Sequence, residues 1–226
     1  MIASPKRSPV VSEFHAATEV SRKNALDALH SEFDEIHSPE RVQQLFEDSL
    51  EQIGHTSTVE AYLPALAGRL TRERLRALGQ SEGKLAKAAP EVLFVAVHDS
   101  GRGQMAAALT RLYAGERLSV STAASGHVED LDPVVNEALV EVGADLEGSY
   151  AKPLTAEVID AADVVVTMAR SVGEISIPES TRHLDWRVGD PGGADMDEVR
   201  RIRDDIARRV QALIGELAPH EPEDAD

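Results

Sequence analysis

The stretch VLFVAVHDSGRGQMAAAL, residues 92–109, contains the transition that decides the fold. Residues 92–96 are all apolar, as expected for a strand buried on both faces of a parallel sheet. Residues 102–113 have the composition of a helix, and Gly101 and Gly103 flank the point where that helix begins. A strand that runs through a small-residue turn into a helix is typical of an α/β fold.

The alternation of strands and helices continues toward the carboxyl terminus. Strands are expected at 92–96, 118–122, 164–168 and 183–186, and helices at 102–113, 133–142, 155–161 and 196–217. Parallel strands joined by helices predict an α/β fold with a four-stranded parallel sheet and helices on both faces.

The amino-terminal part has only the helical period. From about Glu13 to Gly79, apolar residues recur at three- and four-residue steps, and no strand-like run interrupts them. Ser38 and Pro39 predict a helix start, because serine accepts from the first amides and proline suits the first position. Gly54 ends that helix. Three helices of this size bury a small shared core, so a three-helix bundle is predicted.

The third of these helices is expected to start near residues 56–58 and to end at Gly79. Pro64 is predicted to lie at a break or in the first turn. The apolar stripe of this helix is expected to comprise Val59, Tyr62, Leu63, Leu66, Leu70 and Leu75.

Composition shifts divide the chain further. The expected divisions are a three-helix bundle at 12–80, a linker at 81–90, an α/β domain at 91–218 and an acidic tail at 219–226. The linker contains small and polar residues and ends at Pro90, which suits a connector, extended or briefly helical.

Composition also excludes several classes of function. The formal net charge of −17 over 226 residues argues against nucleic acid or an acidic membrane as the main partner. The chain has no cysteine, which excludes disulfides, thiolate metal sites and thiol catalysis. No apolar run reaches the ~18 residues of a membrane span, and no signal-peptide pattern is present, so a cytoplasmic location is expected.

The turn from strand to helix has the features of an anion site. The backbone amides of Val97, His98, Asp99, Ser100, Gly101, Arg102 and Gly103 are the candidate oxyanion ligands. Successive amides and the positive end of a helix favour an anion, and the Arg102 guanidinium matches two oxygens of a phosphate-like ion. The alternative is a purely structural turn. His98 has no second ligand at a suitable spacing, so no metal and no cofactor are expected.

The same run resembles the signature loop of the low-molecular-weight protein tyrosine phosphatase superfamily, and Gln104-Met105-Ala106 resembles its arsenate reductase branch. Further motifs follow in order: residues 121–126, 152–154, 162–168 and 184–191. The resemblance implies that Asp190 is the general acid. The amino-terminal helices resemble an extension found on some actinobacterial arsenate reductases.

The loop departs from this family at its reactive positions. The resemblance implies a cysteine nucleophile where Ala96 stands, a serine or threonine where Gly103 stands, and an asparagine where Asp99 stands. The resolving cysteines of thioredoxin-linked relatives are absent from residues 169–174. Three changes in one loop favour a protein that has lost catalysis naturally. The alternative is a genuine arsenate reductase or phosphatase inactivated by replacement of its cysteine with alanine.

Three functions follow as hypotheses. The first is a non-catalytic protein that binds phosphate, sulfate or arsenate, or docks a phosphorylated partner. The second is an interaction protein that forms a homodimer through its amino-terminal helices. The third is an enzyme that uses water with Asp99, Asp190 or His98, although nothing replaces the covalent step.

The state of Arg102 is the open question within the loop. Arg102 either keeps a bound oxyanion or organises an empty pocket by pairing with Asp99 or Asp190. An inward carboxylate at Asp99 would take the place of the ligand. Trp186, the single tryptophan, is expected at the pocket rim or in the core.

Overall fold

The structure is a computed structural model that describes residues 9–54, 62–168, 173 and 175–218. It divides into two compact units, Met1–Gly79 and Gln80–Asp226, which are described separately. The domain boundaries 12–80 and 91–218 are kept as a proposal. The predicted tail at 219–226 and the helix start near 56–58 lie outside the described residues.

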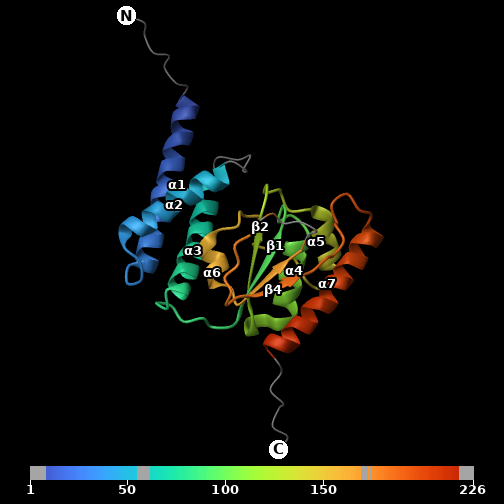
Figure 1. The fold of residues 1–226 in the computed structure, drawn as a ribbon. Coiled ribbons are helices and arrows are strands. Elements are labelled where there is room, and N and C mark those ends of the chain that lie inside the picture. Colours follow the sequence, from blue (N-terminus) through green and yellow to red (C-terminus); the bar gives the residue numbers. More distant parts are fainter. Residues whose placement is uncertain (1–8, 55–61, 169–172, 174, 219–226) are drawn as a thin grey trace, which may run out of the picture. The chain divides into compact units, whose positions relative to one another are not determined.

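The described residues of the first unit form three helices, α1 (Pro9–Phe33), α2 (Pro39–Gly54) and α3 (Leu63–Ser81) (Figure 1). The Ser38 hydroxyl accepts a hydrogen bond from the Arg41 amide at 3.3 Å, which confirms the predicted start of α2. The core of this unit is formed by buried side chains from all three helices, among them Leu29, Phe33, Val42, Phe46, Leu70 and Leu75.

Two details of α3 differ from the sequence prediction. Gly79 does not end the helix, which continues to Ser81. Tyr62 is 65% exposed and precedes the helix, so its place in the apolar stripe was wrong. A tyrosine at a frayed start can leave its hydroxyl in water, and periodicity alone does not show this. Pro64 lies in the first turn, where its missing N–H costs nothing.

The second unit contains a four-stranded sheet in the order β2-β1-β3-β4, in which every pairing is parallel. Its strands are β1 (Glu91–Ala96), β2 (Ser119–Ala124), β3 (Val164–Thr167) and β4 (Arg182–Asp185). The predicted four-stranded parallel sheet is confirmed.

Helices cover both faces of this sheet (Figure 1). Val92 and Phe94 of β1 pack with residues of α4 (Arg102–Ala114), α5 (Pro133–Val140) and α7 (Met196–Leu217). Leu93 and Val95 pack on the other face with Ile159 of α6 (Ala156–Ala161). Because successive side chains of a strand point to opposite faces, this central strand must be apolar throughout.

Trp186, just after β4, is 8% exposed and lies in the larger of these cores. Its ring centroid is 5.7 Å from that of Phe94, at an interplanar angle of 50°. The core placement expected from the sequence is therefore confirmed.

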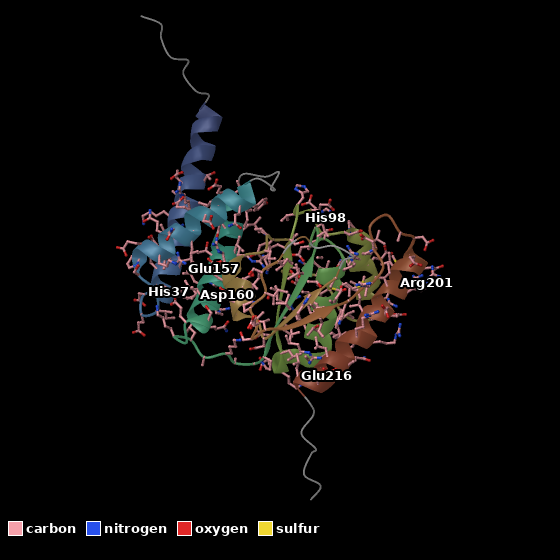
Figure 2. All side chains as sticks on the ribbon, viewed as in Figure 1. His37, His98, Glu157, Asp160, Arg201 and Glu216 are labelled. Atoms are coloured by element: carbon pink, nitrogen blue, oxygen red, sulfur yellow. The ribbon has the colours of Figure 1, made fainter. Side chains whose placement is uncertain are left out.

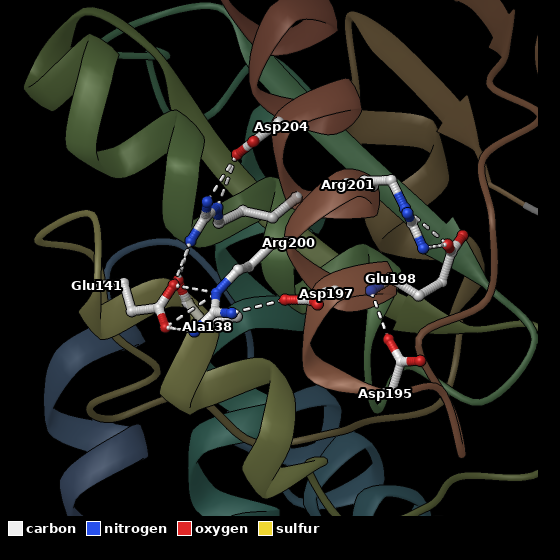
Figure 3. Close-up of polar contacts among 9 residues, drawn as sticks. Ala138, Glu141, Asp195, Asp197, Glu198, Arg200, Arg201 and Asp204 are labelled. Atoms are coloured by element: carbon white, nitrogen blue, oxygen red, sulfur yellow. Dashed lines mark hydrogen bonds and ion pairs between the residues drawn. The ribbon is translucent and has the colours of Figure 1, made fainter.

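Charged side chains fix α7 to the end of α5 (Figure 3). Glu141, directly after α5, accepts hydrogen bonds from Arg200 and Arg203, and these bonds lower its pKa to about 2. Arg203 is 8% exposed and also donates to the Ala138 carbonyl at 2.8 Å. Since α5 begins next to the loop described below, this contact helps to hold one wall of the candidate site.

No helix in the described part of the chain combines the length and apolar character needed to cross a membrane. The homodimer through the amino-terminal helices and the cytoplasmic location stay predictions.

Candidate functional site: the loop between β1 and α4

The loop at residues 96–102 connects the carboxyl end of β1 to the first turn of α4. Gly101 stands immediately before the helix, and its carbonyl accepts from the Met105 amide at 2.8 Å. A side-chain carbon at Gly101 would lie 2.8 Å from Cγ of Pro191, closer than any real contact. Glycine is therefore required here by the close approach of the segment after β4.

A second segment, residues 125–132, runs along this loop and holds it by backbone hydrogen bonds. The carbonyls of Ala96, Val97, His98 and Ser100 accept from the amides of Ser125, Gly126, Glu129 and Asp132, at 2.9, 3.0, 3.2 and 3.0 Å. Within the described residues, no atom accepts a hydrogen bond from the amides of residues 98–102. Unused amides at the start of a helix are the donors that bind an oxyanion.

The loop lines one side of a cavity of about 180 Å³. The lining residues are Ala96, His98, Asp99, Ser100, Gly101, Arg102, Glu129, Asp132, Asp190, Pro191 and Gly192. Of the predicted oxyanion ligands, Val97 and Gly103 are not among them. The structure thus brings three segments together around one cavity: Ala96 ends β1, Arg102 begins α4, and Asp190 follows β4.

Arg102 contributes a nearly buried guanidinium, with its side chain 12% exposed. Its Nη2 atom lies 3.2 Å from Oδ2 of Asp190, whose side chain is 66% exposed. Of the two partners that the sequence offered for Arg102, the structure selects Asp190. Because this ion pair is open to water on the Asp190 side, an incoming oxyanion can compete for the guanidinium.

Asp99 points away from the cavity and into the protein. Its backbone has φ 53°, and the residue is fully buried. Its Oδ2 atom accepts from Nε2 of Gln104 and Oγ1 of Thr122, both at 3.0 Å, and from the Lys152 amide at 3.3 Å. Of the alternatives that the sequence left open, the structure therefore does not show the pairing of Asp99 with Arg102. The left-handed backbone turns this side chain behind the loop.

The Asp99 carboxyl lacks one partner. Within the described residues, Oδ1 accepts no hydrogen bond, although it is buried. Burial raises the pKa of Asp99 to about 7, against the opposing effects of Lys152, Thr122 and Gln104. The loop thus contains a carboxyl group that is neutral in a large fraction of molecules near pH 7.

The two small residues of the loop face this orphaned oxygen. A side-chain carbon at Gly103 would lie 3.1 Å from Oδ1 of Asp99 and 3.6 Å from Cβ of Ala96. The three positions at which the chain departs from the family signature therefore meet at one point in space. Ala96 offers a methyl group there, which cannot act as a nucleophile.

His98 lies at the edge of the cavity, where the sheet ends (Figure 2). Its Nδ1 atom lies 3.1 Å from the His127 carbonyl and 3.4 Å from Oε1 of Glu129. The side chain is 43% exposed.

Sequence reasoning missed Glu129, Asp132, Pro191 and Gly192 as lining residues. Asp132 caps α5 by accepting from the Val134 amide at 2.9 Å, so Asp132-Pro133 is a recognisable helix start. That motif could have indicated that the segment before α5 lines the cavity. Nothing in the sequence pairs Glu129 with His98. The cysteine-free segment 169–174 lies outside the described residues except for Gly173.

The class of fold is therefore α/β, and its four-stranded parallel sheet places a turn of backbone amides and Arg102 together at the start of α4. The chain belongs to the low molecular weight phosphotyrosine protein phosphatase family, which it matches over residues 91–222, on its arsenate reductase branch. Residues 23–79 match a family described as a protein-tyrosine-phosphatase-like amino-terminal domain.

Individual relatives agree with this assignment. The chain is 31% identical over 131 residues to a putative arsenate reductase of Halobacterium salinarum, covering 56% of this chain and 92% of that protein. It is 29% identical over 122 residues to an arsenate reductase of Bacillus cereus, covering 53% and 90%. A thioredoxin-dependent arsenate reductase of Corynebacterium glutamicum superimposes with a TM-score of 0.77 at 31% identity, over 87% of this chain and 96% of that one.

Proposed function

We propose that this chain is a non-catalytic oxyanion-binding protein built on the arsenate reductase scaffold. The observation that carries the proposal is the loop itself, in which amides without an acceptor among the described residues and the Arg102 side chain line a cavity that Ala96 also lines. Phosphate, sulfate and arsenate fit the donor geometry equally well, since all are tetrahedral oxyanions. Without a thiol at position 96 no covalent intermediate forms, so Asp190 has no leaving group to protonate.

Sulfate binding tests this proposal directly. We expect isothermal titration calorimetry to detect sulfate binding at millimolar concentrations, and Arg102→Ala to weaken it at least tenfold. Arg102→Lys keeps the charge but loses the two-pronged donor, so binding by this variant should be intermediate. Arg201→Ala is the matched control, because it removes one arginine from the exposed surface of α7. No heat of binding at ten millimolar sulfate would refute the proposal.

Restoring the nucleophile alone is expected to restore little chemistry. We expect no turnover of an aryl phosphate by the native chain, and only trace turnover by Ala96→Cys. The neighbouring Asp99 carboxyl and the missing hydroxyl at Gly103 leave a thiolate unsupported, which keeps its pKa high. The triple variant Ala96→Cys, Asp99→Asn, Gly103→Ser should exceed the single variant at least tenfold.

A spectrophotometric assay of nitrophenol release compares these variants. Full activity of Ala96→Cys by itself would favour the alternative function, an arsenate reductase or phosphatase that lacks only its cysteine. Equal inactivity of all variants would show that further positions of the site have changed.

A further inference from the structure

The cavity wall carries an excess of negative charge for an anion site. Apart from Asp99, whose carboxyl is turned behind the loop, the described lining residues supply carboxyl groups from Glu129, Asp132 and Asp190, whereas their basic side chains are those of Arg102 and His98. The Glu129 and Asp190 side chains are 51% and 66% exposed, so both face solvent at the mouth. A free oxyanion that enters the cavity therefore passes these carboxylates, which repel it, before it reaches the backbone amides of the loop.

These carboxylates are held in place by the backbone. The Glu129 amide donates to the His98 carbonyl and the Asp132 amide donates to the Ser100 carbonyl, at 3.2 and 3.0 Å. Glu129 and Asp132 are thus attached to the loop itself, on the segment that precedes α5. Asp190 comes from a different segment, after β4. The acidic groups therefore flank the loop from two separate chain segments, and the backbone of one of these segments is bound to the loop.

The charge of Arg102 is already matched by Asp190, 3.2 Å away. An oxyanion that binds the Arg102 guanidinium in place of Asp190 breaks this ion pair and leaves the Asp190 carboxylate without its cationic partner. Among the described residues, the His98 ring is the basic group that lies within ion-pair distance of Glu129. A ligand that supplies cations of its own next to its oxyanion satisfies both carboxylates, whereas a free ion satisfies neither.

We propose that the oxyanion received by this cavity is a phosphorylated side chain within a basic segment of a partner protein. Cationic residues on either side of the phosphorylated residue pair with Glu129 on one wall and with Asp190 on the other. The inference rests on the oxyanion-binding function proposed above and adds the class of ligand. Carboxylates at the mouth also act against acidic phosphorylated segments, which gives specificity through repulsion.

Peptide binding at 0.15 M salt tests the inference, because distant charges are then screened beyond ~8 Å. Two nine-residue sequences, one flanked by arginines and one flanked by glutamates, are each prepared with phosphoserine and with phosphotyrosine, and the arginine peptides are also prepared without phosphate. Calorimetry compares the affinities of all these peptides. We expect the basic phosphopeptide to bind at least tenfold more tightly than the acidic one. The unphosphorylated basic peptide should bind at least tenfold more weakly than its phosphorylated form.

Charge variants locate the effect at the cavity mouth. Glu129→Gln should reduce the preference for basic flanks at least threefold, and Glu129→Lys should reduce it further. Glu116→Gln removes the same charge from the exposed turn after α4 and should leave the preference unchanged. Trp186 fluorescence and circular dichroism confirm that each variant is folded.

Each outcome has a distinct meaning. Equal affinity for basic and acidic phosphopeptides, with sulfate still bound, overturns this inference and leaves the oxyanion function standing. Equal binding of the phosphorylated and unphosphorylated basic peptides also overturns it, because attraction to the net negative chain then explains the result. If sulfate and every phosphopeptide fail to bind, the proposed function itself has failed.

Discussion

Asp99→Asn is expected to raise the free energy of unfolding by about 4 kcal/mol at pH 8 and to change it by less than about 1 kcal/mol at pH 4. Burial raises the pKa of Asp99 from 3.8 in the unfolded chain to about 7 in the folded protein. Below pH 3.8 both states hold the proton. Between pH 4 and 7 only the unfolded state gains from ionisation, so the native protein loses stability as the pH rises through this window.

The asparagine variant has no such proton to lose. Its amide oxygen can still accept from Gln104, Thr122 and the Lys152 amide, so the anchoring of the loop survives. Urea unfolding followed by Trp186 fluorescence at pH 4, 6 and 8 measures the difference between variant and native chain. Asp130→Asn is the control, because Asp130 is exposed two residues before the Asp132 cap. A difference that does not grow with pH would contradict the buried-carboxyl assignment.

Phe94→Ala is expected to destabilise the α/β unit by about 4 kcal/mol. Phe94 is fully buried in the central strand and packs against Trp186. Its removal loses the transfer free energy of the ring and leaves a cavity that the strand cannot close, since β1 is paired on both sides.

The same urea titration measures this loss, because the single tryptophan reports on this unit. Leu112→Ala in α4 is the control, since Leu112 is 41% exposed and should lose less than about 0.5 kcal/mol. A decrease of less than about 1 kcal/mol in the free energy of unfolding of Phe94→Ala would contradict a central role of Phe94 in the core.

The elements of the α/β unit were predictable because their patterns are local. The run at 92–96 is apolar on both faces, and the structure places it centrally, as such a run requires. Errors occurred at boundaries. The strand predicted at 118–122 is observed at Ser119–Ala124, and the helix predicted at 133–142 ends at Val140, before the turn at Gly143. The limits of a strand depend on pairing with its neighbour, and helix ends fray by one or two residues, so propensity alone does not give either boundary.

The site was predictable in part. The sequence located the loop and Arg102, because a helix start after a buried strand is a position where amides are left unused. It did not show which way the Asp99 side chain turns, since one left-handed residue reverses its direction. The second wall at residues 129–132 was missed, because the backbone hydrogen bonds that join it to the loop leave no mark in residue types, although the helix start at Asp132-Pro133 marks where it ends.

The stretch at residues 92–109 by itself determined the fold class, the position of the candidate oxyanion loop and the absence of a nucleophilic side chain at Ala96. These follow from which side chains are apolar, small or missing, and such properties belong to single residues. Only the tertiary structure decided that Arg102 pairs with Asp190, that Asp99 lies behind the loop, and that carboxylates line its mouth. Those facts depend on three chain segments that meet at the carboxyl edge of the sheet, where distance in space is independent of distance in sequence.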